Sequence, residues 1–87
     1  MFAADTLPGL MRTGLVKKFE RTDIGTIVTV SENLWKPRSD FFKHSLLTAI
    51  RVYNTVNGYE ERTQIMDAAT GTVYAEILPS SVMKFYD

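Results

Sequence analysis

The amino-acid sequence predicts an all-β fold, either a small barrel or a rolled antiparallel meander of about five strands with one short helical segment. Two observations favour it. A run of β-branched residues ends at Val30 and is typical of a strand. Residues 48–84 can be written as three antiparallel strands, joined by two turns, whose apolar residues share one face. Because a one-residue slip at either turn would destroy this shared face, the two turn signals support each other.

Length and composition limit the class of protein. The chain has 87 residues, with 45% hydrophobic and 23% charged side chains, which indicates one small globular domain and not a disordered tail. We expect an N-terminal arm over residues 1–12 and a single small β-barrel domain over residues 13–87. The net charge is zero, which disfavours a dedicated DNA-binding domain. The sequence contains no cysteine, so disulfides and thiolate metal sites are excluded.

The N-terminal sequence shows no positive leader with an apolar run, and no window approaches the roughly 20 apolar residues that a membrane span requires. We therefore expect a cytoplasmic protein that does not bind membranes.

The first strands precede Val30. Residues 15–19 alternate weakly between apolar and polar side chains, and residues 20–23 resemble a turn. Residues 24–30 form the strongest predicted strand, because every residue except Gly25 is isoleucine, valine or threonine. Residues 32–43 then form the longest irregular connection, which Pro37 interrupts.

The two turns set the register of the next three strands. Asn57-Gly58 is a strong signal for a two-residue hairpin, and this turn would place Ile50 opposite Ile65. The second turn, residues 67–71, offers a glycine for a bulge and would place Ile65 opposite Val73. The residues predicted to form the apolar face are Ile50, Val52, Ile65, Val73, Ala75 and Ile77.

A helix competes with the strand before the first turn. Ser39 could cap a helix whose apolar face carries Phe42, Leu46, Ala49, Ile50 and Tyr53 at helical spacing. The β-branched residues that follow Leu47 argue against extending it. We therefore predict a short helix over residues 39–46, followed by a strand.

The segment Ile77-Leu78-Pro79-Ser80-Ser81-Val82-Met83-Lys84 resembles the end of SH3 domains, where a strand leads through a Pro-Ser-Asn-Tyr-Val element and a short 3₁₀ turn into the last strand. This resemblance implies an SH3-like topology. The aromatic residue that SH3 domains use for peptide binding is missing from the segment, as is their opening Ala-Leu-Tyr-Asp-Tyr strand. Recognition of polyproline peptides is therefore not carried over to this chain.

Two candidate binding surfaces follow from the predicted fold. The first is the basic, aromatic connection, where large rings would be costly to expose without a purpose; they could contact a partner or fold back to plug an open end of the barrel. The second is the outward face of the sheet, where tyrosine and arginine are typical of recognition surfaces but could also be an ordinary solvated face. The candidate residues are Trp35, Lys36, Arg38, Phe41 and Phe42 in the connection, and Arg51, Tyr53, Arg62 and Tyr74 on the sheet.

No motif indicates catalysis, a metal or a cofactor. His44 is the only histidine and has no carboxylate pattern beside it, and the glycines are too dispersed for a phosphate loop. We therefore predict a non-enzymatic binding module that acts by protein–protein contact; its size suits a small accessory or virus-encoded regulator or inhibitor of a larger protein. The alternatives are a nucleic-acid-binding barrel that uses the same residues for stacking and phosphate contact, and a structural subunit that assembles with itself or with neighbours.

Overall fold

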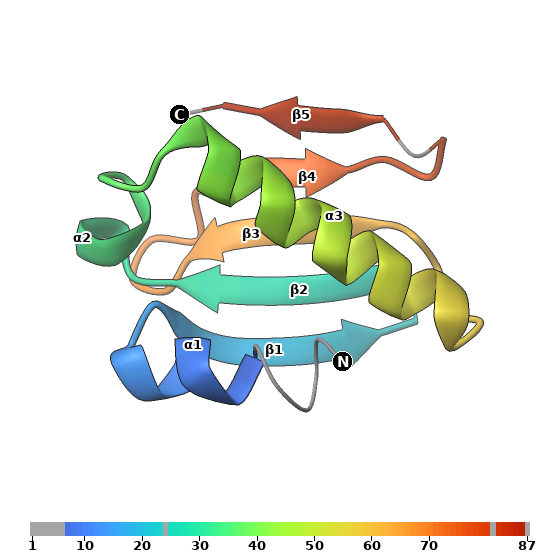
Figure 1. The fold of residues 1–87 in the computed structure, drawn as a ribbon, viewed down its shortest axis with the longest axis horizontal. Helices are drawn as coiled ribbons and strands as arrows, with labels where there is room; N and C mark the ends of the chain where they lie inside the picture. The colour runs from blue at the N-terminus through green and yellow to red at the C-terminus, as the bar shows by residue number, and fades with distance from the viewer. Residues whose placement is uncertain (1–6, 24, 81, 87) are drawn as a thin grey trace.

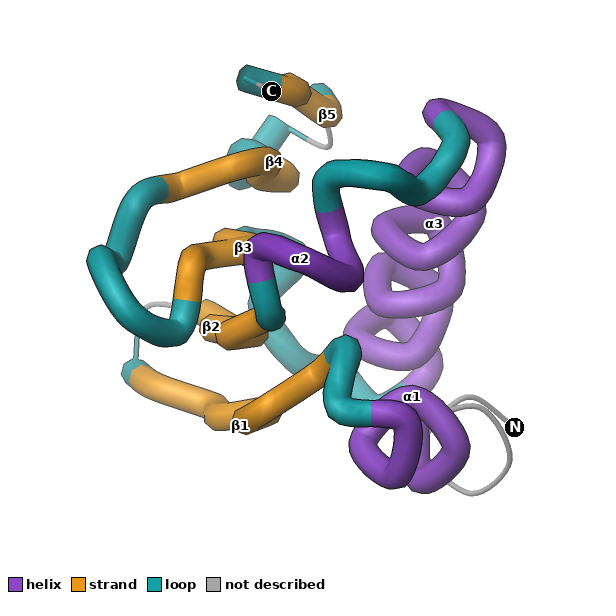
Figure 2. The backbone as a smooth tube through the Cα atoms, turned by 90° about the vertical axis from the view of Figure 1, so that its left-hand side faces the viewer, coloured by secondary structure: helices purple, strands orange, loops and turns teal. Residues whose placement is uncertain are grey.

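A five-stranded sheet carries its helices on one side (Figures 1 and 2). The computed structural model describes residues 7–23, 25–80 and 82–86. The elements, in chain order, are α1 (Leu7–Thr13), β1 (Val16–Thr22), β2 (Gly25–Val30), α2 (Glu32–Trp35), α3 (Asp40–Val56), β3 (Thr63–Asp67), β4 (Val73–Ile77) and β5 (Met83–Phe85).

The strands lie in the order β1-β2-β3-β4-β5, and the sheet is open. The β2 and β3 strands are parallel, whereas the other three neighbouring pairs are antiparallel. Parallel neighbours need a long crossover connection, and α3 provides it. The number of strands agrees with the sequence prediction. The prediction of an all-β fold is supported only in part, because a long helix covers one face of the five-stranded sheet. The predicted barrel does not form, since the sheet is open, and the alternative of a fully antiparallel meander is wrong, since β2 and β3 are parallel.

The first two strands agree with the sequence prediction. Thr26, Val28 and Val30 share one buried face of β2, as their alternation predicts. The β1 strand extends to Thr22, so most of the expected turn at residues 20–23 is strand. Ile24 lies outside the described residues. Within the expected N-terminal arm, residues 7–12 belong to α1 and residues 1–6 lie outside the described part.

The hairpin predicted at Asn57-Gly58 is wrong, because α3 continues to Val56 and these two residues end it. The amide N–H of Tyr59 donates to the carbonyl of Asn54 at 2.8 Å, and the N–H of Gly58 donates to Thr55 at 3.2 Å. Gly58 has a φ of 72°. This pair of bonds around a left-handed glycine is the Schellman motif, a common way to end a helix. Asn-Gly suits a hairpin and a helix end for the same reason, since both need positive φ.

The helix forms despite its β-branched residues because it covers the sheet. Its buried side chains are Lys43, Leu46, Leu47, Ile50 and Asn54. Burial of such a face stabilises a helix more than the few tenths of a kcal/mol per residue that β-branched side chains cost. The start of the helix agrees with the sequence prediction: the hydroxyl oxygen of Ser39 accepts a hydrogen bond of 3.1 Å from the N–H of Phe42.

The second predicted hairpin is confirmed, with its register shifted by two residues. Ile65 pairs with Ala75 rather than with Val73, and Thr63 pairs with Ile77. Because the shift is even, Ile65, Ala75 and Ile77 still face the same side, as predicted. The prediction is wrong for Val73, because a further register shift pairs it with Met66, on the other face of the sheet. Beyond β4, a short turn leads into β5, and the N–H of Leu78 donates to the carbonyl of Val82 at 2.9 Å. The resemblance of this segment to SH3 domains stays a prediction.

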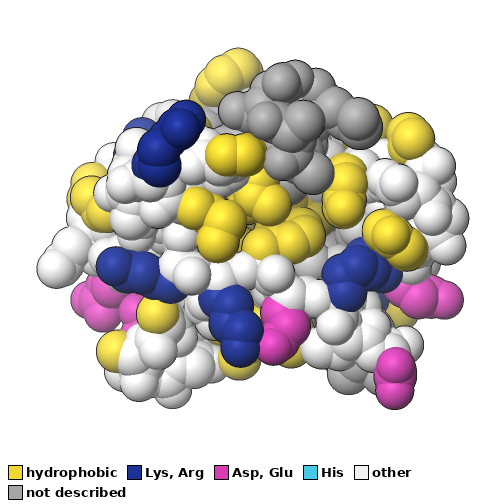
Figure 3. All heavy atoms as spheres, turned by 90° about the horizontal axis from the view of Figure 1, so that it is seen from below, with side chains coloured by type: hydrophobic (Ala, Val, Ile, Leu, Met, Phe, Trp, Pro, Cys, Tyr) yellow, Lys and Arg dark blue, Asp and Glu magenta, His cyan; other side chains and the backbone are white. Residues whose placement is uncertain are grey.

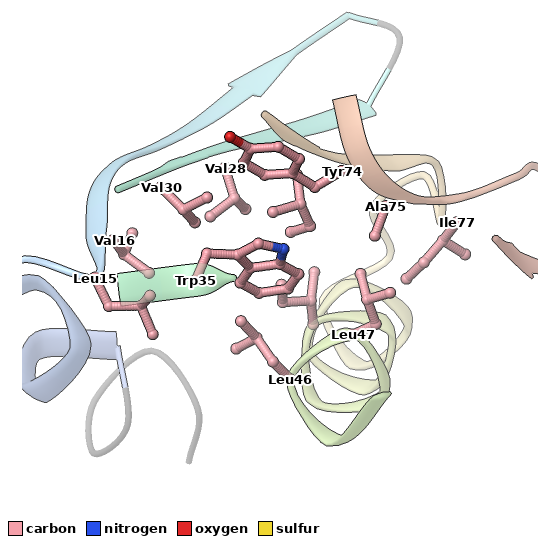
Figure 4. Packing of buried hydrophobic residues seen from close by; sticks show 12 residues of the cluster. Leu15, Val16, Val28, Val30, Trp35, Leu46, Leu47, Tyr74, Ala75 and Ile77 are labelled. Carbon is pink, nitrogen blue, oxygen red and sulfur yellow. The ribbon is translucent and has the colours of Figure 1, made fainter. Parts of the chain in front are cut away.

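The hydrophobic core lies between the sheet and α3, and Trp35 is at its centre (Figure 4). The α2 helix carries this indole ring into the space between the strands and Leu46 and Leu47. Its side chain is fully buried. Tyr74 lies on the same side of the sheet, where a register shift between β3 and β4 interrupts the alternation.

The other face of the sheet carries no described helix (Figure 2). The alternation of the strands places on this face a mixed set of polar, charged and apolar side chains: Lys18, Glu20, Ile27, Thr29, Gln64, Met66, Glu76 and Lys84. Tyr86 donates a hydrogen bond of 2.7 Å to Glu76. Such mixed polarity is typical of a sheet face that contacts water.

Candidate functional site: the exposed face of α3

The α3 helix crosses in front of the sheet, and no described element covers its outer side (Figures 1 and 2). We define the α3 outer face by the residues that lie opposite the buried stripe: Phe41, Ser45, Thr48, Val52, Thr55 and Val56. The spacing of three and four residues places these side chains along one stripe of the helix. The structure therefore presents the full length of a 17-residue helix on one surface.

The α3 outer face carries no charged side chain, and it mixes three apolar residues with one serine and two threonines. Phe41 is 82% exposed, Val52 is 53% exposed and Val56 is 74% exposed. The only charged side chain at a fully exposed position of α3 is Asp40, in the first turn. The solvent side of a surface helix normally carries charged and polar residues. A stripe of exposed apolar side chains in their place is typical of a binding surface.

Basic residues lie beside the N-terminal end of this helix. Lys36, Arg38 and Lys43 line an open hollow together with Asp40. Each of the three cations also lies over an aromatic ring. Lys43 Nζ is 5.4 Å from the ring centre of Trp35, the Arg38 guanidinium is 4.9 Å from that of Phe42, and Lys36 Nζ is 5.8 Å from that of Tyr74. Cation–π contacts of this kind hold the positive charges close to the helix end.

The predicted aromatic connection divides into buried and exposed residues. Trp35 is fully buried, so the structure places it in the core and it is not a contact residue. Phe42 is half-buried and packs against the core. Lys36 and Arg38 are exposed, and Phe41 projects from the first turn of α3. The alternative that some of these rings fill the interior therefore holds for Trp35 and Phe42, whereas Phe41 keeps the exposure that a contact residue needs.

The four residues predicted on the outward face of the sheet do not share a surface. Arg51 and Tyr53 lie on α3, because the segment predicted as a strand is helical. Arg62 precedes β3, where its carbonyl accepts a hydrogen bond of 2.9 Å from the N–H of Thr26. Tyr74 is 4% exposed and lies over the core. The predicted sheet surface is therefore wrong as a surface, since its residues belong to three separate parts of the fold.

Sequence reasoning missed Val52 and Val56 as surface residues. In the predicted strand, Val52 belongs to the apolar inner face, whereas in the helix it lies on the outer side. The signal that could have found them is the helical spacing of a second set of uncharged residues. Phe41, Ser45, Thr48 and Val52 follow one another at steps of three or four, which marks a second helical stripe opposite the buried one.

A polar cluster lies beneath the C-terminal end of α3. Asn54 is fully buried, and its Oδ1 accepts a hydrogen bond of 3.1 Å from the guanidinium of Arg21. The same guanidinium donates to the hydroxyl of Thr26 at 3.1 Å and lies 3.5 Å from the ring centre of Tyr59. Asn54 Nδ2 donates to the hydroxyl of Thr63 at 3.4 Å. These groups satisfy one another, so the cluster has a structural role: it fixes α3 against β1, β2 and β3.

A second polar area lies where the parallel strands β2 and β3 end. Asp67 Oδ2 accepts hydrogen bonds from the N–H of Thr70 at 2.7 Å, from the hydroxyl of Thr70 at 2.9 Å and from the N–H of Ala69 at 3.1 Å. The hydrogen bonds from Thr70 are the main cause that lowers the pKa of the Asp67 carboxyl below its ordinary value of 3.8. This carboxylate therefore orders the turn between β3 and β4.

A further apolar area is visible from below, on the side of α1 and β1 (Figure 3). Hydrophobic side chains gather there, with charged side chains along one border. Leu7 and Leu10 of α1 pack against the core, whereas Met11 is 44% exposed. No residue of α1 is buried, so this helix lies at the margin of the fold.

Three further observations concern metal binding, membrane spans and the surroundings of His44. No three histidine, aspartate or glutamate side chains within residues 7–23, 25–80 and 82–86 are grouped so that they could bind a metal ion. No helix in the described part combines the length and apolar character that crossing a membrane requires. His44 stacks on Phe85 with ring centres 6.0 Å apart.

Comparison with protein-family models, with curated proteins and with solved structures finds no match to this chain. The candidate site is therefore identified from the geometry of this structure alone. The fold defines a two-layer domain in which one long helix packs on an open, mixed five-stranded sheet.

Proposed function

We propose that this chain is a non-enzymatic binding module that acts by protein–protein contact, and that the α3 outer face is its contact surface. The observation that carries the proposal is the exposure of Phe41, Val52 and Val56 along a helix face without a charged side chain. Protein interfaces have apolar centres that are depleted in charge, with polar residues around them. Lys36 and Arg38, at one end of the face, supply such a polar border.

The rest of the surface offers weaker candidates. The open face of the sheet mixes Lys18, Glu20, Glu76 and Lys84 with few apolar residues, and those charges would have to be desolvated or paired in a dry interface. The α3 outer face requires no such desolvation at its centre. Phe41 is also the kind of anchor that enters a partner's pocket, because an aromatic ring buries a large area at small entropic cost.

The same geometry argues against single-stranded nucleic acid as the ligand. Stacking platforms for bases combine exposed rings with basic side chains along the backbone path. Along α3 the basic residues are Lys43, which is buried, and Arg51, which is half-buried. Regulation of a larger protein remains an expectation from size, to be tested once a partner is identified.

Site-specific photo-cross-linking tests the proposal. A photoreactive phenylalanine analogue at Val52 should form adducts with protein in cells that express the chain. The same analogue at Gln64, on the open face of the sheet, should form few. Absence of protein adducts at Val52, or adducts with nucleic acid in their place, would refute protein contact through this face.

A second experiment uses a substitution. Phe41→Asp places a charge at the exposed anchor without disturbing the core, and it should abolish the adducts formed from position 52. Phe41→Leu keeps an apolar side chain and should retain most of them. If both variants cross-link as strongly as the parent chain, Phe41 is not part of the contact surface.

A further inference from the structure

The sheet ends at β5, and no described element lies beyond this strand (Figure 1). We propose that the free edge of β5 binds an extended segment of another protein as an additional antiparallel strand, with an acidic residue opposite Lys84 and an apolar residue on either side of it. This surface is different from the α3 outer face, because it consists of backbone groups and of the side chains of β5.

The hydrogen bonds on the inner side of β5 show which of its backbone groups are free. The N–H of Tyr86 donates to the carbonyl of Tyr74 at 2.8 Å, and the carbonyl of Val82 accepts a bond of 2.9 Å from the start of the turn after β4. Successive residues of an antiparallel strand direct their backbone groups alternately toward the neighbouring strand and away from it. Met83 and Phe85 therefore direct their N–H and C=O groups toward the open edge.

These groups require an extended backbone as their partner. A row of unpaired N–H and C=O groups at a sheet edge is a template for another strand. Met83 and Phe85 can each exchange both hydrogen bonds with one residue of an added antiparallel strand, and this pairing is slightly more stable per residue than the parallel one. The edge is thus suited to binding by strand addition, in which backbone bonds provide affinity and side chains provide specificity.

The opposite edge of the sheet is protected against such addition. The β1 strand carries Lys17, Lys18, Glu20 and Arg21, and a register shift between Val16 and Lys18 interrupts its pairing. The α1 helix also lies beside it (Figure 1). Charged side chains and bulges keep edge strands from pairing with other chains. Within β5 the only charged side chain is Lys84, so strand addition is directed to this edge.

The side chains of β5 favour apolar residues at two positions of the added strand. Phe85 lies opposite Ala75 and Met83 lies opposite Ile77, so both point to the side of the sheet that α3 covers. Phe85 is 39% exposed and stacks on His44 of α3, with ring centres 6.0 Å apart. Side chains directly opposite each other on neighbouring strands pack together. Apolar residues opposite Phe85 and Met83 would therefore continue two apolar rows of the sheet.

Lys84 favours an acidic residue between these two. It is exposed on the other side of the sheet and makes no ion pair with a described residue. Its cross-strand neighbour Glu76 instead accepts a hydrogen bond of 2.7 Å from Tyr86. The residue opposite Lys84 on an added strand would lie one strand spacing from Lys84 and two spacings, about 10 Å, from Glu76. The nearest charge is therefore positive, and a carboxylate at this position complements it.

A second copy of this chain fits the edge less well. Two β5 strands that pair antiparallel through Met83 and Phe85 of both copies place their Lys84 side chains directly opposite each other. Like charges in this position are destabilising. Lys84 therefore opposes self-association through this edge and favours a different chain that carries a carboxylate.

NMR titration with a synthetic peptide tests the proposal. The probe is acetyl-Thr-Val-Glu-Val-Thr-amide at millimolar concentration, which offers a glutamate for Lys84 and a valine for each of Met83 and Phe85. The amide protons of Met83 and Phe85 should shift, and their exchange with solvent should slow. The amide of Lys84, which already faces β4, should change much less. Unchanged exchange at Met83 and Phe85 overturns the proposal.

A charge exchange tests the acidic position. The matched peptide with lysine in place of glutamate should bind the parent chain about fivefold more weakly, because an attractive cross-strand pair becomes a repulsive one. Lys84→Glu should reverse this preference. If both chains prefer the same peptide, or if neither distinguishes the two, the acidic partner is excluded.

A proline substitution tests the backbone bonds. Phe85→Pro removes an N–H that faces the open edge, and proline is tolerated on the free side of an edge strand, so the pairing of β4 with β5 should persist. This variant should lose binding, whereas Phe85→Leu keeps the N–H and should retain most of the affinity. Equal binding by Phe85→Pro and the parent chain overturns the proposal. If Phe85→Pro does not fold, the exchange of the Met83 amide in the parent chain decides.

The remaining outcomes separate this inference from the proposed function. Slow exchange of Met83 and Phe85 that develops with protein concentration, without peptide, identifies a second copy as the occupant and overturns the proposal. If the analogue at Val52 captures a protein while the peptide leaves β5 unchanged, the proposed function holds and strand addition fails. If the peptide binds at β5 while Val52 captures nothing, strand addition holds and the α3 outer face fails.

Discussion

Arg21 donates a hydrogen bond of 3.1 Å to the buried side-chain oxygen of Asn54, and this bond joins the edge strand β1 to the last turns of α3. The contact links residues that are 33 positions apart in the chain. It lies at the end of α3 where the parallel strands begin, so it helps to hold the helix in register with the sheet.

Asn54→Ala should therefore lower the free energy of unfolding by about 2 kcal/mol, because it removes the hydrogen bonds of the buried Asn54 amide to the Arg21 guanidinium and to the Thr63 hydroxyl. Urea denaturation measures the change. The exposed neighbour Thr55→Ala should stay within about 0.5 kcal/mol of the parent chain. In a double-mutant cycle, Arg21→Ala should cost less in the Asn54→Ala background than alone. Strict additivity would show that the two side chains do not act together.

Trp35 should be the most sensitive position in the core. Its side chain is fully buried, and its Nε1 finds no hydrogen-bond acceptor among the described residues. Trp35→Ala should cost about 3–5 kcal/mol through the cavity that it leaves. Trp35→Phe should cost much less, because it keeps most of the ring and removes the unpaired donor. Thermal unfolding should rank the two in this order, and equal losses would mean that Nε1 is bonded in solution.

The end of α3 provides a test of the helix itself. Gly58 has a φ of 72°, and nothing lies within 4 Å of the position a Cβ would occupy, so Gly58→Ala adds backbone strain alone. It should cost about 1 kcal/mol. Gly9→Ala, within α1, should be neutral or slightly stabilising, since alanine has the higher helix propensity. NMR Cα shifts should be helical through residues 49–56; extended shifts there would contradict the fold.

Asp67 should make the fold sensitive to acid. Its pKa is lower in the folded chain than its ordinary value of 3.8, chiefly because of the hydrogen bonds from Thr70. A lowered folded pKa contributes stability that is present above the unfolded value and is lost as the pH falls through the folded one. Asp67→Asn should therefore be less stable than the parent chain at pH 7, and the difference should shrink below pH 3.8. A difference that does not change with pH would exclude this carboxylate as the cause.

Some elements could be predicted because their signals were local. The alternation of β-branched residues identified β2, and the glycine turn over residues 67–71 identified the hairpin of β3 and β4. Ser39 identified the start of α3, since a cap depends on residues within one turn. Phe41 is exposed in the first turn of this helix, and its role as a contact residue stays a prediction.

The secondary structure of residues 48–56 was decided by the tertiary structure. Their β-branched side chains and the Asn57-Gly58 pair suit a strand with a hairpin, and they also suit a helix that ends in a Schellman motif. The apolar surface of the sheet selects the helix, because only the helical spacing buries Leu46, Leu47 and Ile50 together against it. The same selection turned Val52 and Val56 outward and created the α3 outer face. The sequence alone determined where the chain turns. Long-range packing decided whether the segment before a turn is a strand or a helix, because the free energy of burial exceeds local propensity.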